Sequence, residues 1–128
     1  MAIIKTSLPI IPITIHRGDD YSSFWKIKKL DGEFLSLGEN DSIIVGIKRS
    51  TEAKNYLIKK IYTSDDFIED GFYFTLLANE TKTFVPSIYE YDIGLKLKNA
   101  NGSYSFYHLI SVSPFIVKDV VTLEEDIT

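Results

Sequence analysis

The sequence contains no cysteine and no long apolar run. The first absence excludes disulfide bonds, thiolate metal sites and a cysteine nucleophile. No apolar stretch approaches the roughly 20 residues that a membrane-spanning helix requires. The opening residues 1–15 carry one basic residue, and Pro9 and Pro12 interrupt their apolar run. We therefore expect neither a signal peptide nor contact with a membrane.

An excess of positive charge is lacking as well. The chain has 14 basic and 18 acidic residues, and its formal net charge is −4. Binding to nucleic acid without sequence preference depends on basic patches. The two short basic runs, residues 25–29 and 48–54, are each followed by acidic segments. We interpret them as solvated faces and expect no nucleic-acid partner.

Aromatic residues, by contrast, are plentiful: there are eight Tyr, eight Phe and one Trp. Aromatic and β-branched side chains fit the pleated surface of a sheet, so the composition favours β-structure. A length of 128 residues suits one domain. We expect that domain to span residues 1–128.

Alternation of apolar and polar residues predicts the strands. It is clearest over residues 89–98, where one face carries Tyr89, Tyr91, Ile93, Leu95 and Leu97. The pairs Asn101-Gly102 and Asp31-Gly32 predict tight hairpin turns, because these residue types accept a positive φ. Further strands are predicted over residues 12–16, 24–30, 42–49, 55–62, 72–77, 103–112 and 115–122.

Less regular segments separate these strands. Residues 17–23 are typical of a turn, and residues 64–71 of a loop with one helical turn. Residues 78–86 are expected to form a connector in which Asn79 caps a single turn. Pro114 is expected to interrupt the chain, and residues 115–122 are either a further strand or an extension of the preceding one. The pattern of residues 55–62 also suits a helix, and that alternative stays open.

Seven or eight short strands without a clear helix predict an all-β fold. Such strands usually pack as an antiparallel β-sandwich, and a closed barrel is the alternative. The predicted core comprises Trp25, Ile27, Val45, Phe74, Tyr91, Ile93 and Leu95.

The two histidines do not indicate a metal or catalytic site. His16 lies near Asp19 and Asp20 in the sequence, but no further ligand has a suitable spacing. We interpret residues 17–20 as a turn whose aspartates bond to their own backbone. The tripeptide Arg17-Gly18-Asp19 matches the integrin-binding motif, but three residues occur by chance too often to indicate that function.

His108 follows Ser105, but the G-x-S-x-G motif of a serine nucleophile is absent. We expect His108 to pack among Phe106 and Ile110. Sequence patterns of phosphate-binding loops are absent too. The sequence thus predicts no catalytic, cofactor-binding or metal-ligating residues, and no enzymatic activity.

Glu90 and Asp92 share one face of the clearest strand. We interpret this face as the solvated side of a sheet. Of the two carboxylates, Asp92 is expected to hold a neighbouring loop by hydrogen bonds.

Trp25 has two open interpretations. A tryptophan on a strand can fill the core of a sandwich, and core packing is the expected role. Together with exposed tyrosines it can instead stack on sugar rings, as in carbohydrate-binding modules.

Several motifs occur in a fixed order along the chain. A polar Arg-Gly-Asp turn ends the first strand. The clearest strand is entered through the pattern Thr-x-x-Phe-x-x-x-x-Tyr-x-Tyr-Asp-Ile. The Asn-Gly hairpin and a closing Phe-x-Val-x-x-x-Val-Thr follow. Together these segments resemble the immunoglobulin-like N-terminal domain of bacteriophage tail baseplate proteins of the upper baseplate type, over residues 13–122. The positions that carry the resemblance are Gly18, Asp19, Thr81, Tyr89, Tyr91, Asp92, Phe115, Val117 and Thr122.

The resemblance implies an immunoglobulin-like sandwich and a structural role in a phage or prophage-derived tail. Such a component is made in the bacterial cytoplasm, resides in the virion, and has other tail or baseplate proteins and copies of itself as partners. The proline-bearing N-terminal segment and the acidic C-terminal segment are natural docking arms. Related domains usually continue into a coiled coil or a receptor-binding portion. The sequence stops soon after Thr122 and starts with Met1, which favours a free-standing component over an excerpt. The alternative function is a carbohydrate-binding module.

Overall fold

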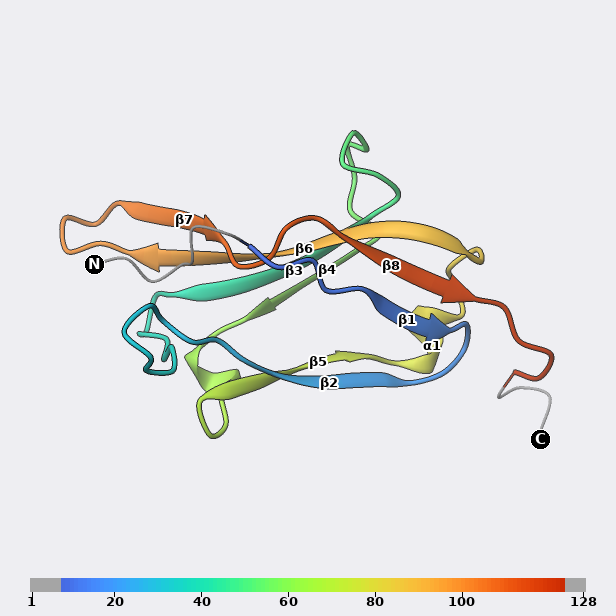
Figure 1. The fold of residues 1–128 in the computed structure, drawn as a ribbon, viewed down its shortest axis with the longest axis horizontal. Coiled ribbons are helices and arrows are strands. Elements are labelled where there is room, and N and C mark those ends of the chain that lie inside the picture. The colour runs from blue at the N-terminus through green and yellow to red at the C-terminus, as the bar shows by residue number, and fades with distance from the viewer. Residues whose placement is uncertain (1–7, 124–128) are drawn as a thin grey trace.

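The computed structural model describes residues 8–123 as a β-sandwich of two sheets (Figure 1). The larger sheet has six strands in the order β1-β8-β6-β3-β4, with β7 also paired to β6, and the smaller one pairs β2 with β5. The strands are β1 (Ile13–His16), β2 (Tyr21–Lys26), β3 (Ser42–Lys48), β4 (Ile58–Tyr62), β5 (Gly71–Leu76), β6 (Ser87–Lys98), β7 (Tyr104–His108) and β8 (Ser113–Lys118). The predicted all-β sandwich is therefore confirmed. Its strand pairs are antiparallel except for β1 and β8, which run parallel.

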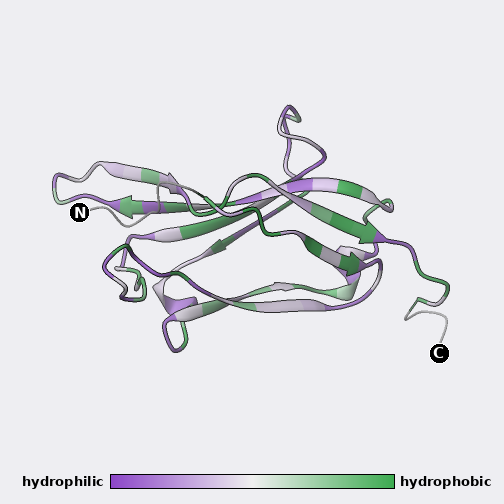
Figure 2. Cartoon of the chain, in the orientation of Figure 1, coloured by the Kyte–Doolittle hydropathy of each residue, from purple (hydrophilic) through white to green (hydrophobic). Residues whose placement is uncertain are grey.

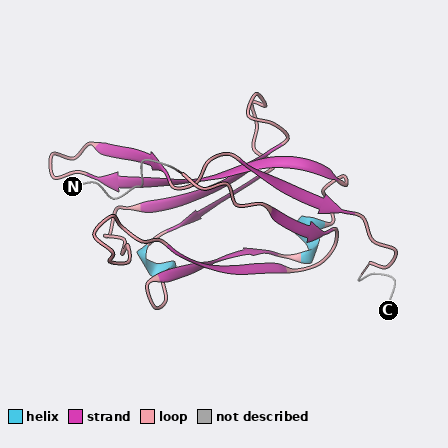
Figure 3. Cartoon of the chain, viewed as in Figure 1, coloured by secondary structure: helices cyan, strands magenta, loops and turns pink. Residues whose placement is uncertain are grey.

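Two short helices flank β5 (Figure 3). A 3-10 turn, η1 (Ser64–Asp66), precedes the strand, which confirms the helical turn predicted there. The helix α1 (Ala78–Thr81) follows it. The predicted cap at Asn79 is wrong: Glu80 accepts the backbone N–H of Leu77 at 3.0 Å, and Asp20 accepts that of Ala78 at 2.6 Å. Residues 58–62 form a strand, so the helical alternative for that segment is excluded. Within residues 8–123, no helix is long and apolar enough to cross a membrane.

The long strand β6 organises the larger sheet. One of its edges pairs with β3, and the other pairs first with β8 and then with β7. Apolar and polar residues alternate along it (Figure 2), and Tyr89, Tyr91, Ile93 and Leu95 are buried against the smaller sheet. Leu97 is only partly buried, because the β6–β7 hairpin extends past the smaller sheet (Figure 1).

The core lies between the two sheets and draws residues from both. Val45 and Phe74 are buried as predicted, whereas Trp25 and Ile27 are only partly buried and pack against the edge of the core. The prediction that Trp25 and Ile27 share the core-facing side of their strand is correct. Their incomplete burial follows from their position at an opening between the sheets, described below.

Several predicted strand boundaries were wrong. β2 begins at Tyr21, inside the predicted turn, because Ser22 hydrogen-bonds to Thr75 at 3.1 Å across the strand pair. The strand ends at Lys26, after which the chain forms a small hairpin around Gly32. The predicted strand 103–112 ends at His108. Pro114 lies within β8, near its start, where a missing N–H is tolerated because β1 pairs with β8 only from Phe115 onward.

One end of the sandwich is held together by polar bonds. The buried Thr81 accepts the N–H of Gly18 at 3.0 Å and donates to the carbonyl of Asp19 at 2.8 Å. The hydroxyl of Tyr89 donates to the carbonyl of Val85, four residues earlier. The Thr81 bonds tie the turn after β1 to the α1 connector. The aspartates of that turn do not bond to their own backbone as predicted, since Asp20 bonds to α1.

Candidate binding surface

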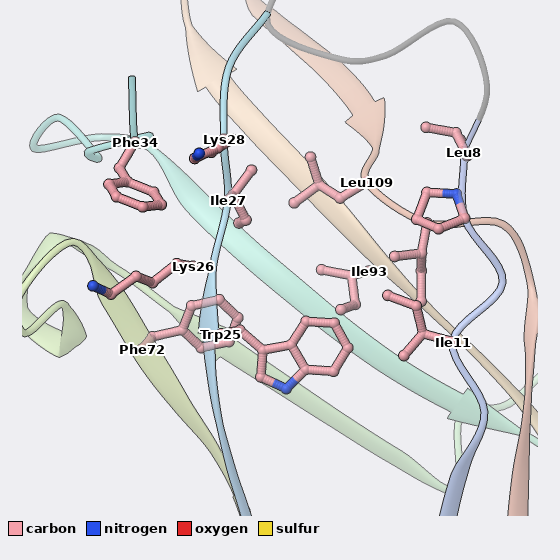
Figure 4. Close-up of a pocket in the computed structure, with 12 residues that line it drawn as sticks. Leu8, Ile11, Trp25, Lys26, Ile27, Lys28, Phe34, Phe72, Ile93 and Leu109 are labelled. Atoms are coloured by element: carbon pink, nitrogen blue, oxygen red, sulfur yellow. The ribbon is translucent and has the colours of Figure 1, made fainter. Parts of the chain in front are cut away.

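An apolar cleft opens between β2 and the extended segment that leads into β1. Its volume is about 380 Å³. Leu8 and Ile11 form one wall, Trp25 and Ile27 form the other, and Ile93 of β6 lies beneath them (Figure 4). Within the described chain, β2 pairs only with β5, so its other edge faces this opening.

Hydrogen bonds to the larger sheet fix the lead-in wall of the cleft. The N–H of Ser111 donates to the carbonyl of Pro9 at 2.8 Å, and the N–H of Ile11 donates to the Ser113 hydroxyl at 2.9 Å. The hydroxyl of Tyr91 donates to the carbonyl of Ile11. Burial, and to a lesser degree the neighbouring Tyr21, raises the pKa of Tyr91, so this phenol remains a neutral donor. The wall is therefore built into the fold.

Trp25 forms the centre of the opposite wall. Its indole N–H donates to the Ser23 hydroxyl at 2.6 Å, and its ring faces Ile11 and Ile93 (Figure 4). The side chain is half-buried. Trp25 is thus neither the fully buried core residue that was predicted nor part of a flat exposed platform.

Lysines and exposed aromatic rings border one end of the cleft. Lys26 lies 5.0 Å from the ring centroid of Phe34, and Lys28 lies 5.6 Å from it (Figure 4). On the outer face of the smaller sheet, the rings of Phe24 and Tyr73 lie 4.8 Å apart, with Tyr73 52% exposed. The cleft and these side chains form one surface that is apolar, aromatic and positively charged.

Alternation along one segment produces both halves of this surface. Trp25 and Ile27 point inward, whereas Phe24, Lys26 and Lys28 point outward. Phe24 lies over Gly71, where a Cβ would stand 2.6 Å from its ring. The outer aromatic group was not predicted, although the alternation that places Trp25 inward also places Phe24 on the opposite face.

The carboxylates of β6 lie on the outer face of the larger sheet, as predicted for a solvated face. Their roles are the reverse of the prediction: Glu90 holds the loop between β3 and β4 by accepting the N–H of Thr51 at 2.8 Å. The Asp92 carboxylate instead lies 3.6 Å from Nε2 of His108. With Tyr56 and Gly46, the two carboxylates line a hollow of about 150 Å³.

His108 is exposed, which corrects the prediction that it packs among apolar neighbours. It meets the edge of the Phe106 ring at 5.3 Å between centroids, but Ile110 is buried and lies beyond the end of β7. The hydroxyl of Ser105 bonds to Asn99 in the hairpin turn at 3.2 Å.

The Arg17 side chain has a structural role. Its guanidinium donates to the carbonyl of Lys82 at 3.0 Å and pairs with Asp119 at 3.4 Å. Among residues 8–123, no three His, Asp or Glu side chains are grouped closely enough to hold a metal ion. His16, Asp19 and Asp20 therefore do not form such a group.

The sequence matches no model of a known protein family. No curated protein is significantly similar to it.

Proposed function

We propose that this protein is a non-enzymatic structural component of a bacteriophage or prophage-derived tail, which acts through protein–protein contacts. Its partners are other tail or baseplate proteins and further copies of itself, and its place is the virion. The observation that carries the proposal is the surface around Trp25, where an apolar cleft, a strand edge that is unpaired within residues 8–123 and exposed aromatic rings adjoin. Aromatic residues are enriched in protein interfaces, and free strand edges are templates for pairing with another chain.

The topology supports the immunoglobulin-like assignment within this proposal. An immunoglobulin-type sandwich carries a tyrosine near the start of one strand, whose hydroxyl bonds to the backbone a few residues upstream. Tyr89, near the start of β6, makes a bond of this type to Val85. The short connector α1 and the pairing of β2 with β5 opposite the larger sheet agree with the same arrangement.

The genomic neighbourhood gives the first test. We expect the adjacent genes to encode tail tape-measure, baseplate or fibre proteins. The second test is co-purification: the protein should bind at least one of those neighbours, and Phe24→Ala with Tyr73→Ala should weaken binding. Neighbours without any tail protein would contradict the proposal.

A carbohydrate-binding module is the second candidate, and one observation favours it. The adjacent Phe24 and Tyr73 rings are exposed on the outer face of the smaller sheet, where a sugar ring could stack. Binding of the isolated protein to a glycan array, lost in Tyr73→Ala or Trp25→Ala without unfolding, would favour this candidate over the tail component.

A further inference from the structure

The cleft beside Trp25 has the character of a receptor for an extended, acidic and apolar peptide. Lys26 and Lys28 stand at one end of it, and neither forms an ion pair within residues 8–123. The rest of the lining is almost wholly apolar. Charge complementarity across an interface selects the partner, and a free strand edge can accept a peptide by main-chain pairing. The ligand should therefore carry carboxylates next to an aliphatic side chain.

The sequence itself contains such a peptide. Residues 123–128 read Leu-Glu-Glu-Asp-Ile-Thr, with three successive carboxylates followed by Ile127. The described chain ends at Leu123, whose side chain lies against Gly18: a Cβ added to Gly18 would stand 2.6 Å from it. The peptide therefore leaves the sandwich next to the turn that precedes β2.

The length of this peptide limits its reach toward the cleft of its own copy. β2 runs away from that turn (Figure 1), and the seven residue-to-residue steps from Tyr21 to Lys28 span about 23 Å at roughly 3.3 Å per step. Residues 124–126, which carry the carboxylates, extend at most about 11 Å from Leu123 at roughly 3.5 Å per residue. The cleft of a second copy has no such constraint.

We propose that residues 124–127 of one copy bind the cleft of another. Glu124, Glu125 and Asp126 meet Lys26 and Lys28, and Ile127 enters the apolar part of the cleft. The contact joins two different surfaces, so repetition gives a ring if the rotation closes and a filament if it does not. This inference rests on the proposed assembly function and specifies the surface through which copies join.

A charge exchange tests the contact in the full chain. The cleft variant carries Lys26→Glu and Lys28→Glu, and the tail variant carries Glu124→Lys, Glu125→Lys and Asp126→Lys. Sedimentation velocity at low salt should show concentration-dependent self-association of the unmodified protein. Each variant alone should weaken it by about tenfold or more, since both lose the charge complementarity. An equimolar mixture of the two variants should restore assembly. The basic tail of one variant can then bind the acidic cleft of the other, and the acidic tail of the second can bind the basic cleft of the first.

Controls keep this test decisive. Lys96→Glu with Lys98→Glu removes the same positive charge from an exposed part of β6 and should leave association unchanged. If the cleft variant failed to fold, a synthetic peptide of residues 120–128 carries the test: it should inhibit assembly of the unmodified protein, and a peptide with lysines at 124–126 should not. Absence of self-association, undiminished association of both variants, or no recovery in the mixture would overturn the inference.

Failure of this contact and failure of the proposed function are distinguishable. A protein that stays monomeric but binds a protein from a neighbouring tail gene would overturn the contact alone. Specific glycan binding by the monomer would contradict the assembly function itself.

Discussion

The two ends of β2 are built in different ways. At its start, polar bonds from Thr81 and Asp20 join the preceding turn to the α1 connector. At its finish, Trp25 and Ile27 line an open apolar cleft, and Lys26 has no ion-pair partner among residues 8–123. The first arrangement lowers the free energy of the folded chain. The second leaves apolar area and positive charge available for a partner.

The largest difference between the ends should be seen on truncating apolar side chains. The end of the sandwich at the start of β2 is called the closed end below. Phe115 is fully buried there, between Phe84 and Tyr91. Phe115→Ala should cost about 3–5 kcal/mol in the free energy of unfolding, through lost contacts and a cavity. Leu109→Ala, in the half-open wall of the cleft, should cost only about 1 kcal/mol. Chemical denaturation measures both, and equal losses would contradict the distinction between the ends.

Removing one hydroxyl should destabilise the closed end by a smaller amount. Thr81→Val keeps the shape of the side chain but leaves the N–H of Gly18 and the carbonyl of Asp19 without their partner. A buried polar group that loses its hydrogen bond costs about 1–3 kcal/mol. Thr83→Val is the matched control, because its exposed hydroxyl bonds only to the carbonyl of Glu80. Thermal unfolding should separate the two variants; a neutral Thr81→Val would show that water replaces the bond.

The smallest expected effect is a pH dependence at the same end. Desolvation acts to raise the pKa of Glu80, but the hydrogen bond from the Leu77 backbone and the ion pair with Lys60 outweigh it and lower the pKa. The unfolded chain therefore binds this proton more readily. The contribution to stability is present above the unfolded pKa of Glu80 and is lost as the pH falls through the lower, folded pKa.

For a partly exposed pair, the loss should be of the order of 0.5 kcal/mol. Denaturation midpoints of the unmodified protein and of Glu80→Gln should converge as the pH falls from about 6 to about 3, because glutamine does not titrate over this range. A constant difference across that range would show that Glu80 does not contribute through its charge.

The sequence predicted those elements whose pattern is complete within one segment. Strict alternation over ten residues, 89–98, located β6 and its buried face, and Asn101-Gly102 located its hairpin, where Gly102 has a φ of 88°. The same pattern could not show where the opposite sheet ends, so Leu97 was expected to be as buried as Leu95. Burial depends on what lies across the core, and that is a property of the whole fold.

The errors around the candidate surface have the same origin. Ser22 and Ser23 suit a turn by composition, yet they lie in β2. There the Ser22 hydroxyl hydrogen-bonds to that of Thr75, and the Ser23 hydroxyl accepts the indole N–H of Trp25. Whether Glu90 or Asp92 holds a loop depends on where residues 49–57 cross the sheet, and local sequence does not determine that. The exposure of Phe24 could have been predicted from the sequence, because alternation along the strand places it on the face opposite Trp25.

Hydrogen–deuterium exchange as a function of protein concentration tests most directly whether the cleft end is the binding end. On self-association, the amides of residues 25–28, at the end of β2 and just beyond it, should become slower to exchange. The amides of Gly18, Ala78 and Thr81, already bonded within the closed end, should keep their rates. Protection that appeared at Gly18 and Thr81 but not along residues 25–28 would contradict the account.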